Sequence, residues 1–220
     1  MKMNKVLLIV PTRGRPTKSL EFYDEFKKNS RITDLVFGLD DDDVEYPRID
    51  GVMYEVNPRA MMNGTLNLIA NKYADQYEYI AFMGDDHRPR TPGWDVELVD
   101  SIKDIKHGIA YGNDLLQGRN LPTAVLLKSS IVKTLGYMAP PAMKHLYLDN
   151  FWKDMGIELR SLFYRDDVII EHLHPVAGKA DNDSGYVEVN SSAIYEHDGK
   201  AFANYWATDK ASDLEKLLND

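Results

Sequence analysis

Short apolar runs alternate with amphipathic segments through the first half of the chain. Runs of strand length occupy 5–10, 35–39, 52–56 and 79–83, and segments with helical spacing of apolar residues occupy 17–28, 58–73 and 94–106. Strands that alternate with helices predict an α/β fold with a mostly parallel sheet flanked by helices. The run at 52–56 alternates only in part, and we expect it at an edge of the sheet.

The second half continues the pattern with shorter pieces. Further strands are predicted at 108–112, 123–127 and 168–175, and helices at 129–135 and from Asp149 to about 155, with Asp149 as the cap. The connection 137–142 carries apolar residues that we expect to be exposed, as a lid, an acceptor wall or a rigid connector. Beyond 175 a polar segment precedes aromatic residues, a helix at about 200–206 and a terminal helix opened by a capping box at 212–215.

Composition limits the class of protein. The chain has 220 residues, 44% of them hydrophobic and 28% charged, as in globular proteins. A formal net charge of -9 argues against a long basic nucleic-acid surface. Cysteine is absent, which excludes disulfides and thiolate metal sites. The N-terminal apolar run follows Lys2 and Lys5 and is too short for a signal peptide or a membrane span, so we expect a cytoplasmic protein.

The run at 79–83 breaks at Gly84 into two adjacent acids, Asp85 and Asp86. Ligands of open α/β sheets bind at the carboxyl ends of the strands. Adjacent carboxylates need a compensating positive charge, and Mg²⁺ is typically held by one or two carboxylates together with substrate phosphates. Arg88 and Arg90 would suit phosphate oxygens, and Thr91 would cap the next helix. The alternative is that the two acids only form a turn.

Other strand ends carry polar residues that suit the same ligand. The first strand ends in a loop with Arg13 and Arg15 before a helix, which predicts an anion site. The second strand ends at Asp40, the first of four acids. In the last strand, His172 and His174 share one face because side chains alternate. They are either a metal-binding pair or two buried histidines.

Five motifs, in this order, resemble those of the nucleotide-sugar glycosyltransferases with the GT-A fold. They are VLLIVPTRGRP, FGLDDDD, YIAFMGDDHRPRTPGW, LYLDNFW and VIIEHLHP. The chain is similar to the large family-two group, including small phage-encoded members, over about 5–175. The resemblance implies a GT-A catalytic domain over 1–176, with a nucleotide-sugar half at about 1–95 and an acceptor half at about 96–176. Residues 177–220 would form an extension that packs on this domain across the mouth of the sheet.

The resemblance also implies roles for individual residues. Asp86 would bind Mn²⁺ or Mg²⁺ together with His172 or His174, and Asp149 would be the general base. The family motif is usually Asp-any-Asp, whereas Gly84 stands at its first acid here, so the division of labour between Asp85 and Asp86 stays open. The residues expected to bind the nucleotide sugar are Pro11, Thr12, Arg13, Arg15, Asp40, Asn63, Asp85 and Arg88.

The implied reaction is metal-dependent transfer of a hexosyl group from a nucleoside-diphosphate sugar, expected to be a UDP-sugar, to an acceptor hydroxyl. One base opposite the leaving group favours inversion. The acceptor would be a glycan or a hydroxylated DNA base, the latter in the host cytoplasm of a phage. One alternative is a metal-dependent nucleotidyltransferase or nuclease that uses Asp40, Asp85, Asp86 and Glu171. Another is a non-catalytic module that binds a nucleotide or a glycan.

Overall fold

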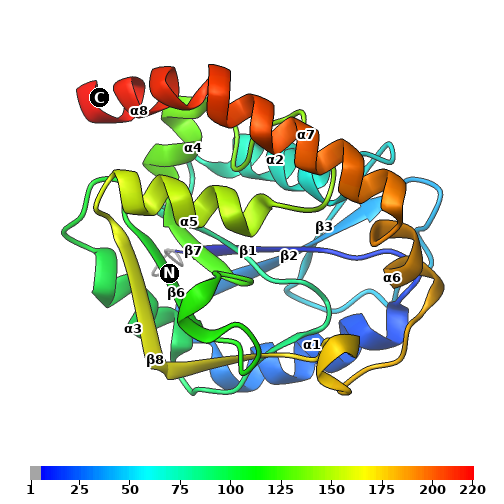
Figure 1. The fold of residues 1–220 in the computed structure, drawn as a ribbon. Coiled ribbons are helices and arrows are strands. Elements are labelled where there is room, and N and C mark those ends of the chain that lie inside the picture. The colour runs from blue at the N-terminus through cyan, green and yellow to red at the C-terminus, as the bar shows by residue number, and fades with distance from the viewer. Residues whose placement is uncertain (1–5) are drawn as a thin grey trace.

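The computed structural model describes residues 6–220, which form one eight-stranded sheet with helices on both faces (Figure 1). Lys2 and Lys5, with the expected start of the first strand, lie outside the described residues. The strands in chain order are β1 Val6–Pro11, β2 Thr33–Asp40, β3 Met53–Asn57, β4 Tyr79–Phe82, β5 His87–Pro89, β6 Ile109–Asn113, β7 Val125–Lys128 and β8 Leu162–His172.

The strand order across the sheet is β3-β2-β1-β4-β7-β6-β8-β5. The first four positions are parallel throughout, and β3 lies at the edge as expected. Strand β7 then runs antiparallel to both β4 and β6, and β5 runs antiparallel to β8. The α/β fold with a mostly parallel sheet is confirmed, although the second half of the sheet is mixed. The parallel half brings the carboxyl ends of β1, β2 and β4 to one edge.

The helices are α1 Pro16–Asn29, α2 Met61–Tyr73, α3 Trp94–Ile102, α4 Ser129–Leu135, α5 Leu148–Glu158, α6 Ser184–Val189, α7 Ser192–Thr208 and α8 Lys210–Asn219. Short 3₁₀ turns lie at Gly118–Asn120 and Pro175–Ala177. Within 6–220, the structure has no helix of the length and apolar character needed to cross a membrane.

The apolar runs are buried on both faces because successive side chains of a strand point to opposite sides. In β1, Leu7 and Ile9 join the core beneath α2, α4, α5 and the C-terminal helices. Val6, Leu8 and Val10 join the core beneath α1 and α3. Figure 1 shows these two layers on either side of the sheet. Burial of each such side chain contributes about 1.5–3 kcal/mol.

The predicted helix boundaries and caps hold for α4 but need correction for α3, α5 and α8. Helix α4 begins and ends as predicted, with Gly136 in the left-handed conformation after it. Thr91 does not cap α3, because Gly93 takes the N-cap position and the Thr91 hydroxyl accepts the N–H of Ile169. Asp149 lies in the first turn of α5, after Tyr147 at the N-cap. Helix α8 begins at Lys210, two residues before the expected capping box.

The connection 137–142 is a rigid connector rather than an exposed lid. Met138 and Ala139 are completely buried. The Asn67 side chain accepts the N–H of Met138 at 2.8 Å and donates to the carbonyl of Ala139 at 2.8 Å. The Trp152 indole N–H also donates to the Met138 carbonyl at 2.8 Å. Only the tip at Pro141 and Ala142 is exposed.

Candidate active site

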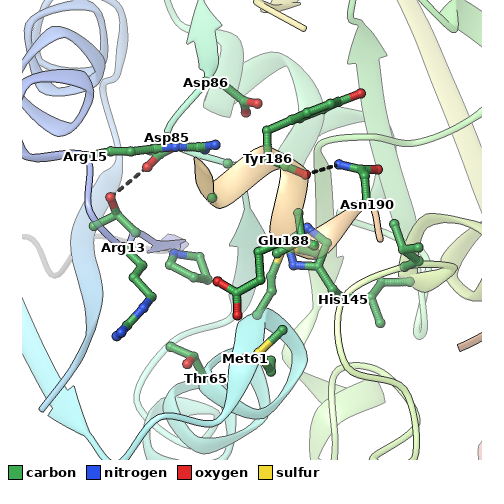
Figure 2. Close-up of a pocket in the computed structure, with 18 of the residues that line it drawn as sticks. Arg13, Arg15, Met61, Thr65, Asp85, Asp86, His145, Tyr186, Glu188 and Asn190 are labelled. Atoms are coloured by element: carbon green, nitrogen blue, oxygen red, sulfur yellow. Dashed lines mark hydrogen bonds and ion pairs between the residues drawn. The ribbon is translucent and has the colours of Figure 1, made fainter. Parts of the chain in front are cut away.

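A cavity of about 450 Å³ opens at the carboxyl ends of β1, β2 and β4. This volume is within the range of about 300–1,000 Å³ that is usual for small-molecule sites. The loop after β1, the end of β2 and the turn after β4 form its floor. The segment that leads into α5 and the C-terminal helix α6 form its walls. Figure 2 shows labelled side chains from the loop after β1, the turn after β4, the segment that leads into α5 and helix α6 around this space.

Three residues that line the pocket could hold a metal ion. Asp86, His87 and His172 each offer one ligand atom, and these atoms lie within 4.8 Å of one another. Asp86 comes from the turn after β4 and His87 begins β5, whereas His172 ends β8. The two segments meet because β5 pairs with β8, with His87 opposite His172, and because the Leu173 N–H donates to the Asp86 carbonyl at 2.9 Å.

The contacts of this cluster fit a cation. Nδ1 of His87 lies 3.0 Å from the N–H of Gly84 and 3.2 Å from Oδ1 of Asp86. This nitrogen can accept from the first or donate to the second, but it cannot do both. Nε2 of His87 and Nδ1 of His172 are buried without a hydrogen-bond partner among the described residues. A carboxylate and two imidazoles form a ligand set that suits Mn²⁺ or a similar divalent ion.

The charge states suit the same role. Burial alone would raise the pKa of Asp86, but the close contacts with His172 and His87 outweigh it and hold the pKa well below its ordinary value. Burial, and next the neighbouring His172, lower the pKa of His87. Asp86 is therefore ionised and His87 neutral at physiological pH, which are the protonation states in which both residues bind metals.

Gly84 gives a physical reason for the departure from the Asp-any-Asp motif. A Cβ at position 84 would lie 2.6 Å from Oδ1 of Asp86 and 3.1 Å from Nδ1 of His87. A side chain there would displace the Asp86 carboxylate. The glycine therefore fits the close packing of the cluster.

His174 is not part of the cluster, so its expected metal role is corrected. Its Nδ1 accepts the N–H of Val176 at 3.2 Å, and its ring packs edge-on between His172 and Tyr186. His172 is the histidine of the pair that joins Asp86, and His87 is a third member that the sequence does not predict. The position of His87 directly after the acid pair could have suggested a ligand. Its pairing with β8 could not be read from the sequence.

The pocket is also lined by three arginines, each paired with acids, and we call this part its basic end. Arg13 lies 2.9 Å from Asp40 and also pairs with Asp42. Arg15 lies 3.0 Å from Asp85 and 2.6 Å from Asp183, which also lies 2.8 Å from Lys18. Arg59 pairs with Glu188. Asp183 directly precedes α6 and Glu188 lies within it. The C-terminal segment therefore supplies acids to the basic end of the pocket.

The two adjacent acids have separate partners. Asp85 is 3% exposed, and it accepts a hydrogen bond from the Thr12 hydroxyl at 2.7 Å and one from Arg15 at 3.0 Å. Burial, and next the charge of Asp86, raise its pKa. Asp86 instead faces the two histidines. Asp86 therefore belongs to the cluster, whereas Asp85 contacts the loop after β1. Pro11, at the start of that loop, also lines the pocket.

Two residues expected to bind the nucleotide sugar do not reach the pocket. Asn63 is completely buried, and its amide donates to the carbonyls of Pro140 and Met143 at 2.7 Å each. Arg88 points away from His87 because side chains alternate in β5, and it pairs with Glu21 at 2.8 Å. Both side chains make contacts within the fold, and neither lines the pocket in which the donor was expected to bind.

Asp149 lines the pocket from the first turn of α5. Its Oδ1 accepts the N–H of Asn150 at 2.9 Å. Burial raises its pKa, which the nearby N–H groups and His172 oppose. A carboxylate with a raised pKa is a stronger base, and it stands in a pocket that also holds the cluster.

The acids that a two-metal nuclease would need do not converge. Asp40 pairs with Arg13, and Asp85 with Arg15. Glu171 pairs with Arg90 at 3.0 Å and Lys179 at 2.8 Å, outside the pocket. Within 6–220, the structure shows a single group of metal-ligating side chains, and it contains one acid.

Comparison with known proteins supports the fold. No protein-family model matches the chain, and no curated protein matches it by sequence. Among solved structures, the mannosyltransferase PcManGT from Pyrobaculum calidifontis, in complex with GDP-Man and Mn²⁺, is similar over 98% of this chain and 73% of its own. The TM-score is 0.58 and the identity 11%.

Two further structures are similar at the same level. TarS from S. aureus matches 76% of this chain with a TM-score of 0.55 and 13% identity, and the matched part spans 36% of TarS. Rv0371c from Mycobacterium tuberculosis H37Rv, in complex with manganese, matches over 79% of this chain and 94% of its own, with a TM-score of 0.52 and 12% identity. At these identities the similarity concerns the fold alone, and the chain has the GT-A-like α/β fold.

Proposed function

We propose that this protein is a metal-dependent glycosyltransferase that moves a hexosyl group from a nucleoside-diphosphate sugar to an acceptor hydroxyl. The observation that carries the proposal is one pocket lined by both the Asp86–His87–His172 cluster and arginines. Mn²⁺ or Mg²⁺ held by these three residues would neutralise the charge that develops on the diphosphate leaving group. The mannosyltransferase of similar fold was solved with GDP-Man and Mn²⁺, which agrees with this assignment.

The diphosphate would bind to Arg15 and Lys18. These two cations now share the carboxylate of Asp183, with its two oxygens at 2.6 and 2.8 Å. A phosphate group offers the same arrangement of oxygens and more charge. The donor would therefore displace Asp183 from the basic end of the pocket, and α6 would shift as it binds.

The nucleoside would lie against the loop after β1. Thr12 and Asp85 are joined by a hydrogen bond of 2.7 Å, which fixes the Asp85 carboxylate as an acceptor for ribose hydroxyls. Asp40, held by Arg13 at the end of β2, would accept from the base. These contacts supply orientation, since buried polar groups in fixed positions discriminate between ligands more than they add to affinity.

The acceptor would enter on the side of α5. Its hydroxyl oxygen attacks the anomeric carbon while the bond from that carbon to the diphosphate oxygen breaks, and the bonding electrons leave with the diphosphate. The acceptor proton passes to the carboxylate of Asp149. A single displacement of this kind inverts the configuration at the anomeric carbon, and the anomer of the product tests that assignment directly.

The donor and the acceptor can be tested together. Hydrolysis of UDP-, GDP- and dTDP-sugars with Mn²⁺ should identify the donor, with UDP-sugars and GDP-mannose as the first candidates. A glycan mixture and hydroxymethylated DNA should be compared as acceptors, although the net charge of -9 weighs against DNA. Asp86→Ala should abolish the turnover. Failure of the wild-type protein to bind or consume any of these donors would overturn the proposal.

A further inference from the structure

The segment 143–147, which leads into α5, is anchored from two sides by completely buried side chains. On one side, the Asn63 amide donates to the Met143 carbonyl at 2.7 Å, and the Asn63 backbone N–H donates to the Lys144 carbonyl at 3.0 Å. On the other side, the carboxylate of Asp198 on α7 accepts the backbone N–H groups at 144, 145 and 146, at 3.0, 2.8 and 2.8 Å. The backbone of the segment therefore cannot move independently of α2 and α7.

The end of the segment, at Tyr147, is also fixed by its surroundings. Tyr147 has a φ of 66°, in the left-handed region that bulky side chains rarely adopt. Its ring stacks on Phe202 of α7 at 5.6 Å and lies against Gly199. A conformation of this cost persists only where the surroundings enforce it. The enforced geometry delivers His145 and Asp149 to the same pocket.

The His145 imidazole is left free by this arrangement. Neither of its ring nitrogens has a hydrogen-bond partner in the part of the chain that the structure describes, whereas His87, His172 and His174 each contact a polar group. Burial lowers the pKa of His145 to about 4. The ring is therefore neutral at physiological pH and offers one donor and one acceptor to a ligand.

His145 lies on the pocket wall that also carries Asp149, and charges from several parts of the pocket act on its ring. The charges that act on the ring are those of Asp198 behind it, Asp86 in the cluster, Arg15 at the basic end and Glu188 of α6. Figure 2 shows His145 on the wall of the pocket near α6. In a nucleotide sugar, the group between the diphosphate and the acceptor is the sugar, and sugar hydroxyls need both a donor and an acceptor.

We propose that His145 contacts a hydroxyl of the transferred sugar, and that Asp198 is the positioning residue that holds it there. The inference rests on the proposed function, since it requires that a nucleotide sugar occupies the pocket. It makes His145 a determinant of sugar recognition rather than of nucleotide binding. It also gives the C-terminal helix α7 a part in specificity, although α7 contributes no side chain to the pocket lining.

The test compares the dissociation constants of UDP with UDP-glucose, and of GDP with GDP-mannose, by titration calorimetry with Mn²⁺. His145→Ala should weaken the nucleotide sugar that the wild type binds by about three- to tenfold, the effect of one lost hydrogen bond. The free nucleotide should change less than twofold. His145→Gln, which keeps a donor and an acceptor, should recover part of the loss. Lys144→Ala is the matched control, because its side chain is exposed in the same segment.

Asp198→Asn should give the same selective loss in a smaller degree, with melting temperature as the check on folding. If His145→Ala weakens nucleotide and nucleotide sugar equally, or neither, His145 does not contact the sugar. If Asp198→Asn folds and leaves the ratio of the two constants unchanged, the positioning role is wrong. A wild-type protein that binds none of the four probes would overturn the proposed function and this inference with it. If the wild-type protein binds a nucleotide sugar but the variants do not behave as expected, only the inference about His145 and Asp198 fails.

Discussion

Oδ2 of Asp86 lies 3.4 Å from Nε2 of His172, although the two residues come from opposite halves of the sheet. Asp86 follows β4, whereas His172 ends β8, which is three positions away in the strand order. The short strand β5 closes this distance by pairing His87 directly with His172. The cluster therefore depends on the pairing of β5 with β8 as much as on the ligands themselves.

We predict that Mn²⁺ raises the melting temperature of the wild-type protein and that Asp86→Ala and His172→Ala abolish this shift. Each variant removes one of three ligands, and the affinity for Mn²⁺ should fall by at least about tenfold. Differential scanning fluorimetry with and without EDTA measures the shift, and calorimetry measures the affinity. His174→Ala is the matched control from the same strand end and should retain Mn²⁺ binding. Loss of binding in the His174 variant alone would contradict the assignment of the ligands.

We predict that Gly84→Ala weakens Mn²⁺ binding without removing a ligand. The new Cβ would lie 2.6 Å from Oδ1 of Asp86, so the carboxylate must move away from the histidines. Displacement of a ligand in this way typically costs about 10–100-fold in metal affinity. Gly185→Ala is the matched control, because its Cβ would make only ordinary contacts in the same pocket. Equal Mn²⁺ affinity in the two variants would show that the close packing at Gly84 is not required.

The parts of the site that follow single strands could be predicted from the sequence. Apolar runs located β1, β2 and β4 within one or two residues, and the carboxyl ends of these parallel strands meet at one edge. One pocket is therefore lined, as expected, by Thr12, Arg13, Arg15, Asp40 and Asp85. Their positions depend only on where each strand ends, which the hydrophobic pattern determines.

The parts that depend on pairing between distant segments could not be predicted. Strand β5 has three residues and no apolar pattern, so His87 and Arg88 could not be assigned to opposite faces. The burial of Asn63 could not be predicted, because its partners are the carbonyls of Pro140, in the connection 137–142 that was expected to be exposed, and of Met143 just after it. The role of Asp198 is likewise visible only once α7 is placed against the segment 144–146.

We predict that Asp183→Asn increases the affinity for free UDP or GDP. The acid now occupies Arg15 and Lys18, and a diphosphate must displace it. A partly exposed pair of this kind contributes up to about 1 kcal/mol, so the gain should be about two- to fivefold. Asparagine still accepts the N–H of Tyr186 and so preserves the cap of α6.

The control for this variant is Asp181→Asn, which removes an exposed acid of the same segment. It has the same change in net charge, so it separates the local contact from the overall field of the protein. Calorimetric titration at low and moderate salt should show a gain only for the Asp183 variant, and salt should reduce that gain. Equal affinities in the two variants would mean that the diphosphate does not bind where Asp183 lies.

We predict an acid limb in the pH profile of kcat/KM that belongs to Asp149. Burial raises the pKa of this carboxyl above its ordinary value of 3.8, and only the ionised form can take the acceptor proton. The rate should therefore fall as the pH drops through the raised pKa, at a higher pH than for an exposed carboxyl. Asp149→Asn should lower kcat by about a hundredfold or more, the usual contribution of a general base, and should leave UDP binding intact. Asp154→Asn, on the same helix but outside the pocket, should keep both the rate and the limb. An Asp149→Asn protein that retains the wild-type rate and profile would exclude this carboxylate as the base.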